Sequence, residues 1–347
     1  MPTVNELRPA LANGPSRHLV TPDDYRSGAR TQIDPRWQQS GWGYRVSGVD
    51  ELTRAIGRIG TLQTGRRYVW RGVADHRWRV RSALFRMLAE EIVGESSGPD
   101  EAALRARERA LLREARSWGL GLGSGGFVDD IHLLATLQHH GIPTRLLDVT
   151  SNPMTALWFA CQKLPPPPGR ASEVRDAAGA LFAFDVADLD EHASLRPSDN
   201  TWGSQRDGLG WPLQRALEVS SETGAPFLIR PSLPDSRMQA QEGLFITGAV
   251  PASPAILGLD GLGLSAGPPP GSEKLAVLFG PTDRGVGRPT RLPFCVLLIS
   301  PDVKAKMRPH LETTYNRSDR VLFPDVAGMV ASLKAGRLDL SDPTVSD

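Results

Sequence analysis

The stretch from residue 138 to residue 160, QHHGIPTRLLDVTSNPMTALWFA, constrains the fold of this chain more than any other. Leucines at helical spacing precede it, and Gly141 and Pro143 end the helix that they predict. Residues 146–150 predict a short strand. A largely buried helix follows, with Ser151 or Asn152 as its cap and Pro153 in its first turn. Two histidines, an arginine, an aspartate and a threonine lie around this one strand. Such a density of polar groups beside a buried element indicates a site.

The composition is that of a soluble globular protein. The chain has 347 residues, of which 40% are hydrophobic and 23% are charged, with a formal net charge of +1. This balance gives no overall attraction to nucleic acid or to an acidic membrane. The two cysteines, Cys161 and Cys295, lie in apolar runs, which favours buried thiols over a disulfide or a thiolate metal site. No signal peptide and no apolar run of membrane-spanning length is found, so we expect a cytoplasmic protein without membrane contact.

The chain divides into three parts by composition. Residues 1–44 are polar and show no sustained period, which predicts an N-terminal arm. Residues 45–335 form the expected domain, and residues 336–347 form a C-terminal tail. Within the domain, irregular loops are expected at about 186–225 and 258–292.

The expected elements describe one α+β domain. Short strands with helices inserted irregularly between them argue against a doubly wound sheet. Strands are expected over 68–70, 146–150, 180–184, 226–229, 238–247, 274–279 and 294–299. Helices are expected over 46–59, 101–118, the leucines before 138, the segment after 152, 302–311 and 325–333.

A basic cluster lies around the first strand. It consists of Arg66, Arg67, Arg71, Arg77, Arg79, Arg81 and Arg86. The cluster is either a solvated strand and loop or a phosphate-binding surface. Arg71, at the end of the strand, is correspondingly either a salt-bridge partner or a cofactor contact.

Several polar residues of the central stretch have a structural interpretation beside the functional one. Adjacent His139 and His140 cannot both face one metal ion from a helix, so one is expected to make structural hydrogen bonds and the other to contact substrate. Arg145 and Asp148 are expected to form a buried ion pair that holds the loop. Thr150 can serve simply as the cap of the following helix.

The aromatic residues are expected mainly in the core. Trp158 and Phe159 belong to the buried helix. Trp70 and Trp78, near the basic cluster, are the better candidates for stacking on a base or on nicotinamide, with burial as the alternative.

Several segments resemble the FRG domain, a family named for an aromatic-Arg-Gly signature. They are WRG at 70–72, QHHGIPTRLLD at 138–148, ALWFA at 156–160, RMQAQEGLF at 237–245 and LFPD at 322–325. The resemblance runs from about residue 45 to residue 335 in the family's order. The second segment is specific, whereas the tripeptide alone is a weak signal.

A more distant resemblance is to arginine-fingerprint ADP-ribosyltransferases. These enzymes place an arginine at the end of an early strand, a Ser/Thr-bearing strand before a helix, and a glutamate on a later strand. Here residues 68–72, 148–160 and 239–242 are similar to the three elements. The resemblance implies an ADP-ribosyltransferase-like fold with a central, split mixed β-sheet and peripheral helices.

The resemblance also implies roles for individual residues. Arg71 would bind the phosphates or ribose of NAD, since a guanidinium offers paired donors to a phosphate. Thr150 or Ser151 would position the ribose, and Glu242 would stabilise the oxocarbenium-like sugar that forms when the glycosidic bond breaks. The catalytic residues would be Glu242, Arg71 and Thr150. The cofactor contacts would be Arg71, Gly72, His140, Thr144, Arg145, Thr150, Ser151 and Gln241.

The third element departs from the transferase pattern. Those enzymes carry Gln or Glu two residues before the catalytic Glu, on the same face of a strand. Here the pair with that spacing is Gln239 and Gln241, and a regular strand would turn Glu242 to the other face. A bulge at Gly243 could re-aim Glu242; otherwise Gln241 takes the catalytic position without a negative charge.

We therefore expect an NAD-dependent ADP-ribosyltransferase or NAD glycohydrolase acting as a bacterial toxin or phage-defence effector. NAD would be the substrate, the acceptor would be nucleic acid, protein or water, and a cognate antitoxin or hydrolase could accompany it. One alternative is a non-catalytic nucleotide- or nucleic-acid-binding module of the FRG fold. Another is a metal-dependent hydrolase or nuclease using Asp148 and histidines, although no second carboxylate clusters with Asp148.

Overall fold

The computed structural model describes most of the chain from residue 36 onward. The described ranges are 36–92, 98–123, 126–164, 176–193, 211–231, 234–254, 256–264, 266–281 and 287–334. Most of the expected N-terminal arm and the whole C-terminal tail lie outside them, as do parts of the two expected irregular loops. Residues 36–44, which the composition assigns to the arm, instead form a helix and most of an edge strand, and Trp37 is fully buried.

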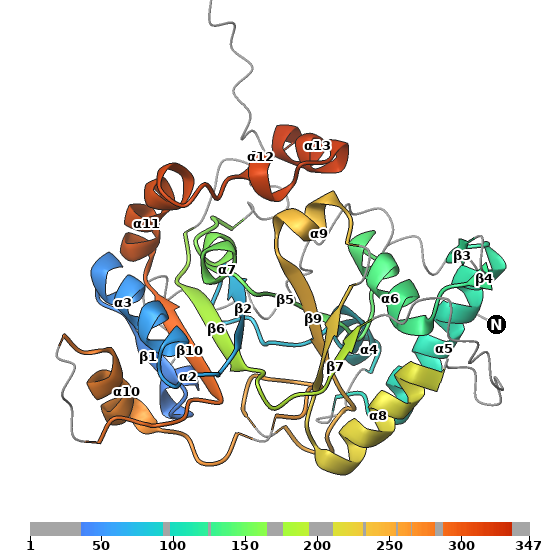
Figure 1. The fold of residues 1–347 in the computed structure, drawn as a ribbon, viewed down its shortest axis with the longest axis horizontal. Coiled ribbons are helices and arrows are strands. Elements are labelled where there is room, and N and C mark those ends of the chain that lie inside the picture. The colour runs from blue at the N-terminus through green and yellow to red at the C-terminus, as the bar shows by residue number, and fades with distance from the viewer. Residues whose placement is uncertain are drawn as a thin grey trace, which may run out of the picture.

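One mixed sheet of eight strands forms the centre of the molecule (Figure 1). The outer pairs β1–β10 and β7–β8 are parallel, and all other neighbours are antiparallel. In spatial order the strands are β1 (Gly43–Arg45), β10 (Phe294–Ile299), β6 (Gly179–Asp185), β2 (Tyr68–Val73), β5 (Leu147–Thr150), β9 (Gly243–Thr247), β8 (Phe227–Arg230) and β7 (Glu191–Ala193). A separate hairpin joins β3 (Leu122–Gly123) to β4 (Gly126–Phe127).

The sheet consists of two halves joined at one residue pair. β2 pairs with β6 along its whole length, and β5 pairs with β9 along its whole length. In contrast, β2 and β5 share only the pair Trp70–Thr150. The sheet is therefore split between β2 and β5, and the end of β5 lies next to the start of β9, where Thr150 faces Gly243.

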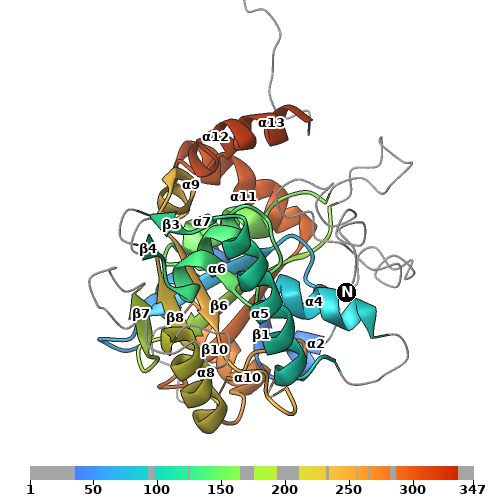
Figure 2. The ribbon, with the colours of Figure 1, turned by 90° about the vertical axis from the view of Figure 1, so that its right-hand side faces the viewer.

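Helices surround the sheet (Figures 1 and 2). Within the described ranges they are α2 (Arg36–Gln39), α3 (Val49–Gly60), α4 (Ala83–Glu91), α5 (Glu101–Ser117), α6 (Asp130–His139), α7 (Pro153–Ala160), α8 (Trp211–Thr223), α9 (Ser236–Ala240), α10 (Gly271–Phe279), α11 (Pro301–Thr313), α12 (Asp319–Leu322) and α13 (Val326–Lys334). None of them is long and apolar enough to cross a membrane.

Side chains alternate between the two faces of the sheet along each strand, so the core consists of separate clusters on the two faces. On β2, Tyr68 and Trp70 pack with α3, α7, α10 and α11, whereas Val69 and Val73 pack on the other face with Trp37 and residues 256–264. A third cluster covers β8 and β9 with α5, α6 and α8. The two halves of the sheet thus have separate helical layers, which meet at β2 and β5.

Helix α7 lies directly on β2. Its N-cap is Asn152, whose side chain accepts the N–H of Met154, and Pro153 occupies the first turn. A Cβ built on Gly72 would lie 1.7 Å from the carbonyl oxygen of Ala156, so only glycine permits this approach. The glycine of the WRG signature therefore serves the packing of strand on helix.

The α+β class agrees with the structure, but three segments differ from expectation. Residues 274–279 belong to helix α10, because Leu275, Leu278 and Phe279 recur at helical rather than strand spacing. Residues 238–247 begin as α9 and become strand only at Gly243, since Asp235 caps a helix there. The expected loop at 186–225 contains α8.

Candidate functional site

Arg71 lies at the split in the sheet and contacts β5. Its Nη1 donates a hydrogen bond of 2.6 Å to the carbonyl oxygen of Asp148 and lies 3.7 Å from the Asp148 carboxylate. The Arg71 side chain is 14% exposed, whereas that of Asp148 is 62% exposed. Burial lowers the pKa of Arg71, and its Nε is buried without a hydrogen-bond partner. Arg71 therefore has a carboxylate partner, but the contact between them is loose.

The loop between α6 and β5 is held by hydrogen bonds of Gln138 from α6 and of Thr144 from the loop itself. The Gln138 amide donates to the Leu146 carbonyl and to the Asp148 carboxylate, and it accepts from the Thr144 hydroxyl at 2.7 Å. The backbone N–H of Leu146 donates to the Thr144 oxygen. Thr144 is fully buried, so its hydroxyl braces the loop and is not presented to a ligand.

The expected ion pair between Arg145 and Asp148 is wrong. The Arg145 Nε lies 2.9 Å from both carboxylate oxygens of Glu108, and its Nη1 lies 3.2 Å from Glu101. The Arg145 side chain is 0% exposed and also donates to the carbonyl of Gly248. Arg145 therefore connects the loop before β5 to α5, and its side chain is too deeply buried to contact a cofactor.

The end of β5 and the start of β9 are joined through side chains. The Thr150 hydroxyl donates to the carbonyl of Gln241 at 2.7 Å and accepts the N–H of Asn152 at 3.0 Å. The Asn152 amide donates to the Glu242 carboxylate at 2.9 Å, and the N–H of Ser151 donates to the Glu242 carbonyl at 3.1 Å. The second and third elements of the sequence pattern therefore meet, with Thr150 as a brace between them. The helix cap is Asn152 and not Thr150.

Glu242 lies in the turn between α9 and β9, not on a strand. Its φ of 50° is in the left-handed region, and its side chain is 40% exposed. Arg317 donates to the same carboxylate at 2.9 Å. The argument from alternating strand faces therefore does not apply. Gln241 is also outside the strand, and its amide donates to the carbonyl of Leu322.

The two histidines have different surroundings. His139 Nδ1 lies 3.1 Å from the Asp235 carboxylate, and burial lowers the pKa of His139 although Asp235 opposes that effect. His140 follows as the C-cap of α6 and is exposed. His139 therefore has the structural contact, while the ring of His140 packs edge-on against that of His139 and is exposed to solvent.

Two further side chains, the aromatic Phe323 and the basic Arg237, lie near the α9–β9 turn that carries Glu242. Phe323 packs against Trp158 and Phe159, and the Arg237 guanidinium lies 4.6 Å from the centre of the Phe323 ring. Figures 1 and 2 show α9 next to α12 above the ends of β5 and β9. Trp70 is buried in the core and cannot stack on a ligand. Sequence reasoning missed Arg317, for which no local signal exists, and Arg237, although the latter lies in an FRG-like segment.

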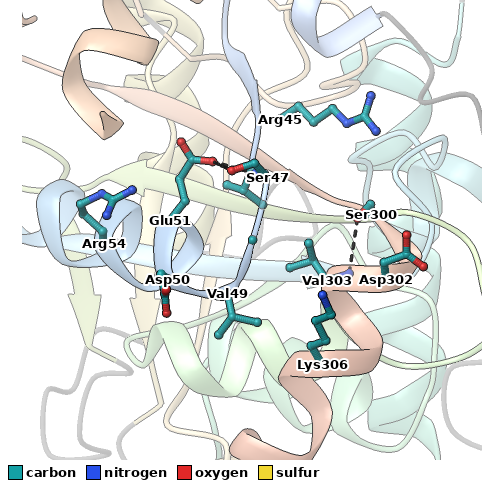
Figure 3. Close-up of a pocket in the computed structure, with 12 residues that line it drawn as sticks. Arg45, Ser47, Val49, Asp50, Glu51, Arg54, Ser300, Asp302, Val303 and Lys306 are labelled. Carbon is teal, nitrogen blue, oxygen red and sulfur yellow. Dashed lines mark hydrogen bonds between the residues drawn. The ribbon is translucent and has the colours of Figure 1, made fainter. Parts of the chain in front are cut away.

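A cavity of about 780 Å³ lies elsewhere, at the β1–β10 edge of the sheet (Figure 3). It is bordered by the first turns of α3 and α11. Its charged lining residues are Arg45, Asp50, Glu51, Arg54, Asp302 and Lys306. Basic and acidic groups are equal in number there, and Glu51 is occupied by the N–H and hydroxyl of Ser47. The charges and hydrogen bonds of the residues that line this cavity therefore favour no particular class of ligand.

Metal chemistry has little support among the described residues. No group of three or more His, Cys, Asp or Glu side chains in the described ranges is placed to hold a metal ion. Cys161 and Cys295 are buried and free, and burial raises the pKa of Cys161 to about 12.

The arrangement defines an α+β protein with a polar site at the split of its sheet. The family model of the FRG domain matches residues 66–167. This match supports the FRG family for the segment that carries Arg71, Asp148 and Thr150, and it ends before Glu242. No curated protein and no solved structure matches the chain.

Proposed function

We propose that this protein is an ADP-ribosyltransferase or NAD glycohydrolase that binds NAD at the split between β2 and β5. The proposal includes a role as a toxin or defence effector, with nucleic acid, protein or water as acceptor. The observation that carries it is the joining of three distant segments. Trp70 pairs with Thr150, the Thr150 hydroxyl donates to the carbonyl of Gln241, and Asn152 donates to Glu242.

The proposed chemistry assigns one task to Arg71 and another to Glu242. Arg71 supplies positive charge for the phosphates of NAD. Glu242, whose carboxylate is 40% exposed, stabilises the positive charge that develops on the ribose as the bond to nicotinamide breaks. Nicotinamide leaves as a neutral molecule. The acceptor oxygen or nitrogen then bonds to the ribose carbon and loses its proton.

Thr150 has an indirect part in this scheme. Its hydroxyl is only slightly exposed and is occupied by Gln241 and Asn152. We therefore assign Thr150 to positioning the turn that carries Glu242. Ser151 and His140, both exposed, are the polar groups that remain for ribose or base.

One observation favours a second function. The Glu242 carboxylate is already bound by Arg317 and Asn152, which is the environment of a structural link. A non-catalytic nucleotide-binding module of the same fold would retain these contacts and would not need a carboxylate for catalysis.

Nicotinamide release separates the two functions. Purified protein would be incubated with NAD alone, with total cellular protein and with total nucleic acid. The proposal expects release in at least one mixture and loss of release in Arg71→Ala. NAD binding without release would favour the binding module, and absence of both binding and release would contradict the proposal.

A further inference from the structure

The carboxylate of Glu242 is bound through one of its two oxygens. The Asn152 amide and the Arg317 guanidinium both donate to Oε1, each at 2.9 Å. Among the residues that the structure describes, none donates a hydrogen bond to Oε2. Because the Glu242 side chain is 40% exposed, Oε2 is the oxygen that a substrate can meet.

Carboxylates that serve as structural links in this protein are held differently. Both oxygens of Glu108 accept from the Nε of Arg145. Both oxygens of Asp260 accept from the guanidinium of Arg79. A contact of this kind occupies both acceptor atoms of the carboxylate. The contact at Glu242 instead fixes the direction of the side chain and keeps the second acceptor available.

Arg317 is itself held at the end of α11. Asn316 has a φ of 51°, in the left-handed region, and turns the chain back toward the helix. The N–H of Arg317 then donates to the carbonyl of Leu311 at 2.7 Å. Leu311 is fully buried in the core cluster that α11 shares with α7 and β2. The two donors to Glu242 therefore start from elements that pack in one core cluster.

Residues 311–323 have further contacts with α9 and the turn that follows it. The Gln241 amide donates to the carbonyl of Leu322 at 3.0 Å. The Arg237 guanidinium lies 4.6 Å from the centre of the Phe323 ring, and Figures 1 and 2 show α12 next to α9. The FRG match at residues 66–167 does not include this segment. The position of the Glu242 carboxylate therefore depends on the C-terminal part of the domain as well as on the matched part.

We propose that Arg317 is a positioning residue that, together with Asn152, fixes the carboxylate of Glu242 so that Oε2 faces the substrate. The role rests on the proposed function, in which Glu242 stabilises positive charge on the ribose. Such stabilisation is strongest when the charged group is held in place before the reaction begins. Arg317 contacts neither NAD nor the reacting atoms in this scheme. Its loss therefore affects the rate of bond breaking and not the binding of NAD.

Nicotinamide release by Arg317→Gln tests the role in the full chain. The kcat is expected to fall at least about tenfold while the KM for NAD stays within about twofold, because the variant loses the orientation of the acid and no contact with NAD. Arg317→Lys keeps the positive charge and should retain a higher kcat than Arg317→Gln. The matched control is Arg320→Gln, an exposed arginine of α12, which should leave both constants unchanged. Thermal unfolding of each variant verifies the fold.

A double variant shows whether Arg317 acts through Glu242. In the Glu242→Gln background, Arg317→Gln should change the remaining rate less than about twofold, because the group that it positions is already absent. A further tenfold loss in the double variant would overturn the inference. A raised KM with an unchanged kcat in Arg317→Gln would also overturn it, because Arg317 would then contact NAD directly.

The wild-type rate separates this inference from the proposed function. Release by the wild-type protein together with a wild-type kcat in Arg317→Gln keeps the enzyme and rejects the positioning role. Absence of release by the wild-type protein with every acceptor rejects the enzyme and, with it, the role of Arg317 in catalysis.

Discussion

The guanidinium of Arg145 is fixed by two carboxylates of one helix. Glu108 and Arg145 are both 0% exposed in their side chains, and Glu101 adds a second contact. Arg145 lies in the loop that precedes β5, so this ion pair anchors the loop to α5. A buried pair of this kind matters most when one partner is removed, because the other charge is left without compensation.

Glu108→Ala is therefore expected to lower the free energy of unfolding by about 3–5 kcal/mol. Denaturant titration followed by circular dichroism measures the change. The control is Glu218→Ala, which removes an exposed partner of Arg215 and should cost less than about 1 kcal/mol. A loss for Glu108→Ala no larger than for the control would show that the pair does not anchor the loop.

His139 gives a prediction on pH. Burial lowers its pKa below the ordinary value of about 6.5, so the unfolded chain binds more protons than the folded one near that pH. The contribution of His139 to stability is therefore lost as the pH falls below about 6.5. Unfolding measured at several values between pH 7 and pH 5 should show a smaller loss of stability in His139→Gln. The exposed His310 provides the control substitution, and an equal change in both variants would contradict the assignment.

At the scale of elements, the packing of α7 on β2 positions the site. Gly72 allows the helix to approach the strand, and Asn152 at the start of the same helix reaches Glu242. The close contact at Gly72, together with the hydrogen bonds from residues 150–152, thus fixes where the N-terminus of α7 lies relative to the α9–β9 turn.

Gly72→Ala should destabilise the protein by about 3 kcal/mol, because the added Cβ overlaps a backbone oxygen that cannot move independently. Gly57→Ala is the matched control. It lies in α3, where an added Cβ meets nothing within 4 Å, and should stabilise by about 0.5–1 kcal/mol. Thermal unfolding of the two variants measures both effects. An unchanged melting temperature for Gly72→Ala would contradict the packing argument.

The elements that form the site were largely predictable from local patterns, but its contacts were not. The strand at β5, the turn before it and the capped helix α7 follow from residues 138–160 alone. Glu101 and Glu108, the partners of Arg145, and Arg317, the partner of Glu242, lie far along the chain, where no periodicity identifies them. Helix α9 was missed because five residues are too few to show a helical period, and its cap at Asp235 was the available signal.

At the scale of the whole molecule, two half-sheets with separate helical layers meet at Trp70–Thr150. A ligand that contacts Arg71 on one half and Glu242 on the other would connect both halves. Hydrogen exchange with NAD is expected to show protection of β2, of residues 148–152 and of the α9–β9 turn. The cavity at the β1–β10 edge should show no change. Protection at that cavity alone would place the ligand elsewhere.

The central claim is that Glu242 acts on the sugar bond of NAD. Its most direct test is the rate of nicotinamide release by wild-type protein, Glu242→Gln and the control Glu218→Gln at equal NAD occupancy. We predict that Glu242→Gln lowers the rate about 100-fold or more and lowers the melting temperature only slightly, because it removes one partly exposed ion pair with Arg317. Glu218→Gln should retain the wild-type rate. Full activity in Glu242→Gln, or no nicotinamide release by the wild-type protein with any acceptor, would contradict the claim.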